Sequence, residues 1–217
     1  MTHPDDSTLR SSTATISDAL DRLGRDGALL GIAPLANGQR IQGRAYTVKY
    51  VPAGNPPGTV GDYLDLVEPG QVVVLDNDGR LDATVWGDIL TAMAHTKGVA
   101  GTVIDGVNRD VAKALELGYP IYSRARFMRT GKDRVEVLAE QVPVTIGGVK
   151  VSPGDLIVGD DDGVVRIPQD IEDEVFRLAA EIDEREDAIL AAVLAGASIA
   201  EARAAQGYHT LQRKQES

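Results

Sequence analysis

The residues best suited to chemistry lie in two short motifs near the middle of the chain. Gly87-Asp88 precedes a segment with helical spacing, and Arg109-Asp110 follows a run of β-branched residues. The carboxylates of Asp88 and Asp110 could hold a hard cation directly or through water, as Mg²⁺ prefers. The Arg109 guanidinium could fork onto a carboxylate or an enolate oxygen. Together the motifs predict a site for an anionic substrate and a divalent metal.

The spacing around these motifs predicts the elements that position them. Apolar residues recur at helical intervals over about 88–97, residues 101–104 form a short buried strand, and 111–117 form a second helix. The first turn of the first helix offers N–H groups and the positive end of the helix dipole, which suit a carboxylate. These groups belong to Gly87, Asp88, Ile89 and Leu90. Ligands of open α/β sheets gather at the carboxyl ends of strands, where Arg109 is expected.

Simpler interpretations exist for each motif. An aspartate that opens a helix is usually only a cap, and Asp-Gly is usually only a turn. Arg109 and Asp110 could form no more than a surface ion pair. The residues by themselves leave these alternatives open.

The rest of the chain fits a single α/β domain over residues 1–217. A polar tail covers about 1–12, C-terminal helices cover about 169–205, and a mobile tail covers about 206–217. Further predicted elements are a helix over 12–24, strands over 43–52 and 72–75, a turn at 77–79, a strand beginning at 118–122, a hairpin over 142–151 and a turn at 160–163.

Two loops have an open role. The Pro- and Gly-rich loop 52–58 is either a plain connection or a rim beside the pocket. Segment 123–134 carries Arg124, Arg126, Arg129, Lys132 and Arg134. In an acidic chain, this cluster either helps to draw in a dicarboxylate or is a solvated loop or subunit contact.

Composition excludes several classes of function. The net charge is −11 over 217 residues, so the basic footprint needed for nucleic acid is missing. No apolar run is long enough to cross a bilayer, and no signal peptide is evident, which predicts a cytoplasmic location. The absence of cysteine excludes thiol catalysis, and the three scattered histidines do not indicate a metal site. Lys97 and Lys113 occupy solvated helix positions, which disfavours a Schiff-base lysine.

The stretch GDILTAMAHTKGVAGTVIDGVNRD closely resembles the RraA-like family. That family includes metal-dependent 4-hydroxy-4-methyl-2-oxoglutarate and 4-carboxy-4-hydroxy-2-oxoadipate aldolases. Segments 43–48, 69–74, 153–156 and 160–165 are similar to other parts of the family pattern, so the resemblance covers roughly residues 10–200. It implies a swivelling β/β/α sandwich with a mixed sheet, assembled as a homotrimer or a dimer of trimers.

The resemblance also implies an activity. This is a class II pyruvate aldolase that cleaves a 4-hydroxy-2-oxo acid, with oxaloacetate decarboxylase activity and Mg²⁺ or Mn²⁺ as cofactor. Asp110 would bind the metal directly and Asp88 through water, while Arg109 and the backbone of residues 87–90 would bind the 2-oxo acid. Glu186, at a family-like distance before Gly196, would reach the metal's water shell from a neighbouring subunit.

Two alternatives belong to other classes. Some family members inhibit a ribonuclease by binding the enzyme, but that branch tends to lose the metal-binding aspartate that this chain keeps as Asp110. The other alternative is a metabolite-binding module without turnover. Pyruvate release from oxaloacetate, with and without magnesium, discriminates among the three.

Overall fold

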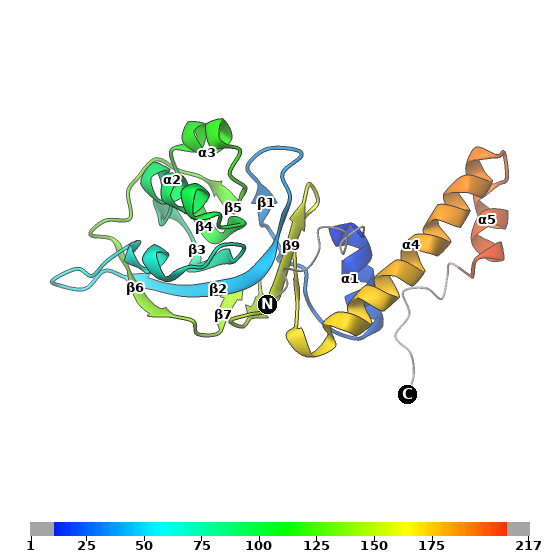
Figure 1. Ribbon diagram of the computed structural model, residues 1–217, viewed down its shortest axis with the longest axis horizontal. Coiled ribbons are helices and arrows are strands. Elements are labelled where there is room, and N and C mark those ends of the chain that lie inside the picture. Colours follow the sequence, from blue (N-terminus) through cyan, green and yellow to red (C-terminus); the bar gives the residue numbers. More distant parts are fainter. Residues whose placement is uncertain (1–10, 208–217) are drawn as a thin grey trace. The chain divides into compact units, whose positions relative to one another are not determined.

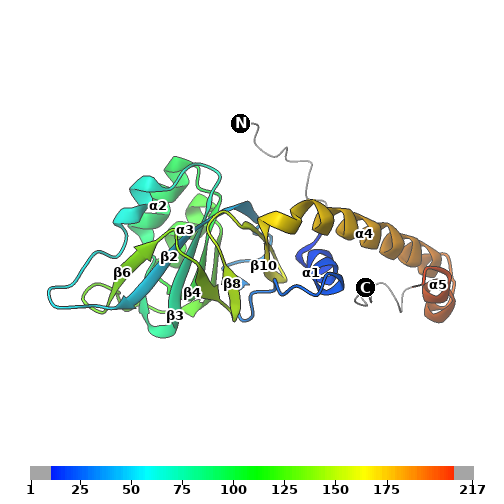
Figure 2. The same ribbon diagram turned by 90° about the horizontal axis from the view of Figure 1, so that it is seen from below.

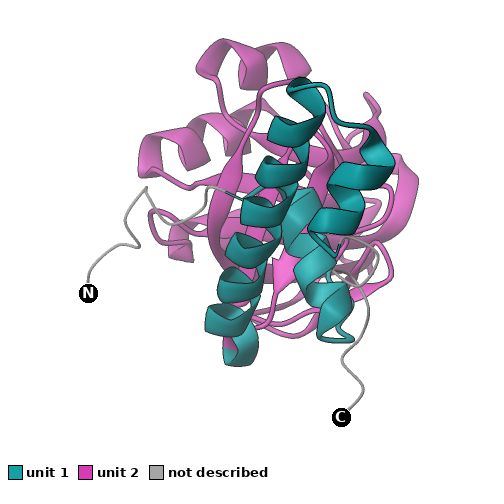
Figure 3. Ribbon diagram, turned by 90° about the vertical axis from the view of Figure 1, so that its right-hand side faces the viewer, with its two compact units in different colours: residues 1–27, 170–217 teal, residues 28–169 magenta. Residues whose placement is uncertain are grey.

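The structure, a computed structural model, describes residues 11–207. Most of the predicted N-terminal tail and most of the predicted C-terminal tail therefore lie outside the described residues, together with His3 and His209. The chain divides into two compact units, 28–169 in one and 1–27 with 170–217 in the other (Figure 3). The expectation that they form a single domain stays a prediction.

Unit 28–169 is built on an eight-stranded mixed sheet, which confirms the predicted α/β class. The strand order is β1-β5-β4-β3-β2-β9-β10, and β6 pairs with β2. Strands β2 to β5 form parallel pairs, whereas β1, β6, β9 and β10 join by antiparallel pairing. The bounds are β1 Ala33–Pro34, β2 Ile41–Pro52, β3 Val72–Thr84, β4 Gly101–Asn108, β5 Ile121–Arg126, β6 Val135–Glu140, β9 Leu156–Asp160 and β10 Gly163–Ile167.

Both faces of this sheet are covered. Helices α2 (Asp88–Lys97) and α3 (Val111–Leu117) lie on one face (Figures 1 and 2), with the 3-10 helix η1 (Asp62–Leu66) packed beside α2. The hairpin of β7 (Val144–Ile146) and β8 (Val149–Val151) packs against the other face. Side chains alternate along the central strands, so neighbouring residues such as Val73 and Val74 enter different cores. Two-sided burial explains why these strands read as continuous apolar runs.

The predicted helices of this unit agree closely with the structure. Helix α2 spans the predicted residues and ends at Gly98, whose left-handed backbone (φ 73°) caps the helix. Helix α3 also has its predicted bounds. The parallel strands β3 and β4 end just before Gly87 and Arg109, so both motifs lie at the carboxyl edge of the sheet.

Strand β3 differs from its prediction because it does not end at the turn signal. It continues past Asn77, and Asp78 and Gly79 adopt positive φ values of 55° and 65° inside a bulge. The bulge is held by the N–H of Asp78, which donates to Oδ1 of Asp76 (3.0 Å). Pairing with β4 then resumes from Arg80. The turn residues supply the local bend, but neighbouring strand pairing keeps the strand in the sheet.

The other unit is helical over its described residues. It contains α1 (Thr13–Arg22), α4 (Glu172–Leu194) and α5 (Ile199–Ala205), and the short η2 (Gln169–Ile171) precedes α4. Helix α1 packs on α4, and two of the hydroxyls near its start, of Ser11 and Thr15, donate to the carboxylate of Asp183. Ser198 opens α5 with a reciprocal capping box to Glu201. Within residues 11–207, no helix is long and apolar enough to cross a membrane.

Candidate active site

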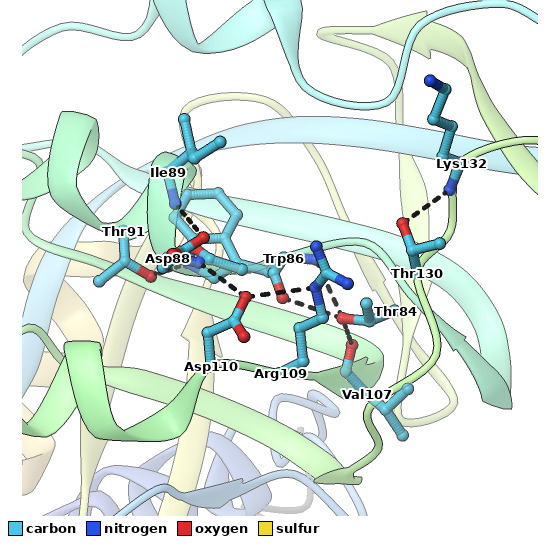
Figure 4. A network of polar contacts seen from close by, with 11 residues as sticks. Thr84, Trp86, Asp88, Ile89, Thr91, Val107, Arg109, Asp110, Thr130 and Lys132 are labelled. Carbon is cyan, nitrogen blue, oxygen red and sulfur yellow. Dashed lines mark hydrogen bonds and ion pairs between the residues drawn. The ribbon is translucent and has the colours of Figure 1, made fainter.

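The two predicted motifs meet in space where β3 and β4 end. Oδ2 of Asp110 accepts a hydrogen bond from the backbone N–H of Asp88 (3.2 Å) and forms an ion pair with Nε of Arg109 (3.2 Å) (Figure 4). The side chains of Arg109 and Asp110 are each 38% exposed, so the pair is open to solvent. The ion pair of the simpler interpretation is thus present, but it lies against the first turn of α2.

Backbone geometry explains two residue types in these motifs. A Cβ on Gly87 would lie 2.8 Å from Oδ2 of Asp110, so a larger residue here would have to displace this carboxylate. Asp110 itself adopts the left-handed region (φ 56°, ψ 40°) immediately before α3. Aspartate and asparagine tolerate that region better than most residues. The backbone therefore places the Asp110 carboxylate at the N-terminus of α2.

A buried network that the sequence analysis missed supports this arrangement. The hydroxyl of Thr84 bonds the carbonyls of Trp86 and Val107 (both 2.9 Å), and so ties the end of β3 to the end of β4. The carbonyl of Trp86 also accepts the N–H of Arg109 (3.0 Å). The indole Nε1 of Trp86 donates to Oγ1 of Thr91 (2.9 Å), which donates to the carbonyl of Gly87 (2.8 Å). The residues of this network are far apart in the sequence or are not types associated with catalysis, so their spacing did not predict that they interact.

Two of the first-turn amides expected to bind substrate already hold carboxylate oxygens. The N–H of Asp88 donates to Asp110, and the N–H of Ile89 donates to Oδ1 of Asp88 (2.8 Å). Asp88 is the first residue of α2, and Gly87 is its N-cap without a side-chain cap bond. These N–H groups therefore donate to carboxylates of the chain itself, and their binding of a substrate carboxylate stays a prediction. A substrate carboxylate would have to displace Asp88 or use the remaining groups of residues 87–90.

A cleft of about 530 Å³ opens beside these groups. Its lining comprises Gly58, Thr59, Val60, Gly61, Asp62, Asp65, residues 84–90, Met93, Arg109, Thr130, Gly131 and Lys132. Asp110 instead borders a smaller pocket of about 270 Å³, which it shares with Arg109. Arg109 lines both spaces, so the cleft, the guanidinium and the Asp110 carboxylate are contiguous.

Loop 52–58 and segment 123–134, whose roles the sequence left undecided, both line the cleft, to different extents. Only the last residue of loop 52–58, Gly58, lines it, followed in the chain by Thr59 to Gly61. Segment 123–134 contributes Thr130, Gly131 and Lys132. The two lysines predicted at solvated helix positions are both half-buried. Lys113 pairs with Glu116, and Lys97 donates to the carbonyls of Leu64 and Asp65.

The oxygen groups at the site suit a hard divalent cation. In the described chain, no group of three or more acidic, histidine or cysteine side chains could enclose a metal. Mg²⁺ commonly binds through one or two carboxylates and keeps several waters. Asp88, which lines the cleft, and Asp110, which borders the adjoining pocket, fit that cation. Their roles as metal ligands stay predictions.

Glu186, the predicted third contributor, lies on α4 in the other unit and is half-buried. Burial, together with the carboxylates of Asp18, Asp183 and Asp187, raises the pKa of Glu186. Its predicted contact is with a neighbouring subunit, so that role stays a prediction.

Comparisons with known proteins agree with these features. The sequence model of the RraA-like family, described as Aldolase/RraA, matches residues 13–166. Protein DlpA of Legionella pneumophila is 40% identical over 198 residues, and the match covers 90% of this chain. The chain spans only 32% of DlpA's length. A Halalkalibacterium halodurans protein named "Putative 4-hydroxy-4-methyl-2-oxoglutarate aldolase" is 37% identical over 187 residues, with 84% of this chain and 87% of that protein covered.

Solved structures with similar folds also include a member of the RraA family. An uncharacterized protein from Pseudomonas syringae pv. tomato superposes with a TM-score of 0.83 at 44% identity, covering 89% of this chain and 93% of that one. RraAS2 of Streptomyces coelicolor, described as an unusual member of the RNase ES inhibitor RraA protein family, gives 0.77 at 33% identity, covering 86% and 97%. By sequence and by fold, this chain belongs to the RraA-like family.

Proposed function

We propose that the chain is a divalent-metal-dependent aldolase that cleaves a 4-hydroxy-2-oxo acid and releases pyruvate, with decarboxylation of oxaloacetate as a second activity. The observation that carries the proposal is the convergence on Asp110. Its carboxylate contacts Arg109 and the first turn of α2 at the edge of one cleft. The aldolase-named relative at 37% identity supports the same reaction class.

Each group has a defined part in this reaction. When bound, Mg²⁺ or Mn²⁺ supplies Lewis-acid stabilisation of negative charge on the 2-oxo acid. The backbone of residues 87–90 orients the substrate carboxylate, and Arg109 faces the oxygen on which charge develops as the carbon–carbon bond breaks. Asp110 and Asp88 would hold the cation at the mouth of the cleft.

The decisive experiment measures pyruvate release from oxaloacetate and from 4-hydroxy-4-methyl-2-oxoglutarate. The reaction is followed with added Mg²⁺, with added Mn²⁺ and with a chelator. We expect turnover that requires the metal and disappears with the chelator. Absence of turnover of both substrates under every condition would contradict the proposal.

An Arg109→Lys variant tests the role of the guanidinium. Lysine keeps the charge but cannot form a two-pronged contact, so kcat should fall by at least about 10-fold if the contact strengthens as the enolate forms. The control Arg80→Lys alters a half-buried arginine that pairs with Asp82 outside the cleft, and it should leave kcat unchanged. A normal kcat with a raised KM in Arg109→Lys would show that Arg109 only binds substrate.

The second candidate function is inhibition of a ribonuclease, which is favoured by the similarity to RraAS2. The presence of Asp110 beside Arg109 favours the enzyme. The aldolase proposal also includes three properties taken from the sequence. These are assembly as a homotrimer or a dimer of trimers, a cytoplasmic location and a lack of nucleic-acid binding.

A further inference from the structure

Part of the cleft is lined by apolar side chains that the proposed reaction does not use. Val60, Leu90 and Met93 line the cleft, are half-buried and pack against the hydrophobic core on the helix-covered face of the sheet. We call these three residues the apolar wall. The buried Val85 and Trp86 line the same cleft. The apolar wall is therefore an extension of the core to the surface of the cleft.

Two segments of the chain meet to form the apolar wall. Leu90 and Met93 lie three residues apart on α2, so their side chains share one face of the helix. Val60 precedes η1, which packs beside α2. A Cβ on Gly61 would lie 2.7 Å from Cδ2 of Leu90, so the Leu90 side chain lies directly on the backbone next to Val60. Because Leu90 also belongs to the first turn of α2, the wall begins where the 2-oxo carboxylate is expected to bind.

The polar atoms behind the apolar wall are bonded within the protein. The carbonyl of Val60 accepts the hydroxyl of the buried Tyr50 (2.5 Å). The carbonyl of Thr59 accepts the N–H of Val137 (2.9 Å), and the indole N–H of Trp86 donates to a hydroxyl on α2. These bonds fix the segment that carries Val60. The wall is therefore preformed and presents mainly carbon atoms to the cleft, as ligand pockets commonly do.

The charges around the cleft indicate what kind of group the apolar wall accepts. Arg109 and Lys132, the cations among the described residues that line the cleft, are not part of the wall. Asp62 and Asp65 are exposed on η1, directly after the Val60 segment, and line the same cleft. Their carboxylates repel an anionic group there, and an exposed ion pair with a cationic group would contribute little. An uncharged aliphatic chain gains by leaving water for the wall.

From this arrangement we infer that the apolar wall binds an uncharged aliphatic chain at the far end of the substrate, so that 2-oxo acids with such a chain are preferred. The inference rests on the proposed function in one respect, which is the position of the 2-oxo end at Arg109 and the first turn of α2. Complete burial of a methylene group raises affinity about 4-fold. Because the wall is only half-buried, we expect about 2- to 4-fold for each methylene group.

The test measures the affinities of pyruvate, 2-oxobutanoate, 2-oxopentanoate and 2-oxohexanoate by calorimetry with Mg²⁺ present. These acids differ only in the number of methylene groups, and none carries the 4-hydroxyl needed for retro-aldol cleavage. Affinity should rise along the series, by about 8- to 60-fold from the first acid to the last. Met93→Gln should reduce this rise to within about 2-fold without changing the affinity for pyruvate, because glutamine keeps the length of the side chain and removes its apolar character.

Matched variants separate the apolar wall from the stability of the core. Met93→Leu keeps an apolar side chain and should keep the rise. Val60→Thr replaces one methyl group of the wall by a hydroxyl and should also lower the rise, which provides a second measurement if Met93→Gln does not fold. Val137→Thr is its control, because Val137 is half-buried against the same core but does not line the cleft. Val137→Thr should keep the rise.

Three results would overturn the inference. They are a series without the rise in the unaltered protein, a rise that persists in both Met93→Gln and Val60→Thr, and an equal loss of the rise in Val137→Thr. Turnover separates this inference from the proposed function. A rise that depends on Met93, in a protein that turns over neither oxaloacetate nor 4-hydroxy-4-methyl-2-oxoglutarate, would support the subsite and refute the aldolase. Turnover without the rise would do the reverse.

Discussion

At Asp110, the backbone and the side chain impose different requirements. The left-handed backbone favours aspartate or asparagine, and the carboxylate must accept an amide N–H and face Arg109. An alanine here would combine backbone strain with loss of the ligand. Asparagine separates the two effects, because it keeps the shape and removes the charge.

We predict that Asp110→Asn lowers the affinity for Mn²⁺ by at least about 10-fold and abolishes turnover, because an anionic ligand is lost. Titration calorimetry measures the affinity. Asp78→Asn is the control, since Asp78 is exposed and has a similar φ of 55°, but lies in the β3 bulge. Equal metal affinity in the two variants would remove Asp110 from the metal site.

At the scale of elements, α2 is positioned by its buried Thr91. The hydroxyl of Thr91 accepts the indole N–H of Trp86 and donates to the carbonyl of Gly87, so one side chain joins the helix to the loop that precedes it. Thr96 occupies the same helix and makes the same kind of bond, to the carbonyl of Ala92 (2.8 Å), but is exposed.

Thr91→Val should lower the free energy of unfolding by about 1–3 kcal/mol, because it leaves the buried Trp86 N–H without its acceptor. Urea unfolding measures this loss. Thr96→Val should have an effect within about 0.5 kcal/mol, as is usual at an exposed position. Equal effects of the two substitutions would show that the Trp86 bond does not hold the helix start.

Loop 52–58 is tied to β6 by one carboxylate. Oε2 of Glu136 accepts the N–H groups of Gly54 (2.9 Å) and Gly58 (2.7 Å), and these bonds lower the pKa of Glu136. Because folding lowers the pKa of Glu136, its ionised carboxylate stabilises the fold at pH values above its unfolded-state pKa. This stabilisation is lost as the pH falls through the folded-state pKa.

We predict that lowering the pH from about 4.5, the ordinary glutamate value, through the lower folded-state pKa of Glu136 reduces the protection of the Gly54 and Gly58 amides, that is, raises their exchange rates relative to the unstructured rates at the same pH. Glu136→Gln should produce the same loss of protection at neutral pH, as measured by hydrogen exchange. Glu68→Gln is the control at an exposed glutamate. If the protection of these two glycines is unaffected by both acid and Glu136→Gln, the carboxylate does not hold the loop.

At the scale of the whole molecule, Glu186 is the residue whose predicted role requires another subunit. Within its own unit it is half-buried beside other carboxylates on α4 and α1, an arrangement that opposes its ionised form. Glu184 lies on the same helix and is exposed. The two positions therefore form a natural pair for comparison.

Glu186→Gln should weaken Mn²⁺ binding and turnover by about 10- to 100-fold, the usual cost of losing a carboxylate that orients metal-bound groups. Glu184→Gln should do little. Mixed oligomers of Asp110→Asn and Glu186→Gln subunits should regain activity, because some sites would receive both intact residues. Mixed oligomers that form normally and stay inactive, or greater sensitivity at Glu184, would show the assignment to be wrong.

The sequence by itself determined the elements whose signals are local. Helix α2 follows from its apolar spacing and the left-handed glycine at its end, and the β7–β8 hairpin follows from its glycine turn. The pairing of Gly87-Asp88 with Arg109-Asp110 was also predictable, because consecutive parallel strands deliver their ends to one edge of a sheet.

Only the tertiary structure decided the features that depend on distant neighbours. Asn77-Asp78-Gly79 was predicted to turn the chain, but pairing with β4 resumes beyond it and keeps β3 in the sheet. Of the cations in segment 123–134, Lys132 lines the cleft, whereas Arg124 is engaged with the buried Asp105. Residue type and spacing cannot tell whether turn residues end a strand or whether a cation is paired. Both depend on strands and loops far along the chain, which only tertiary packing brings next to these residues.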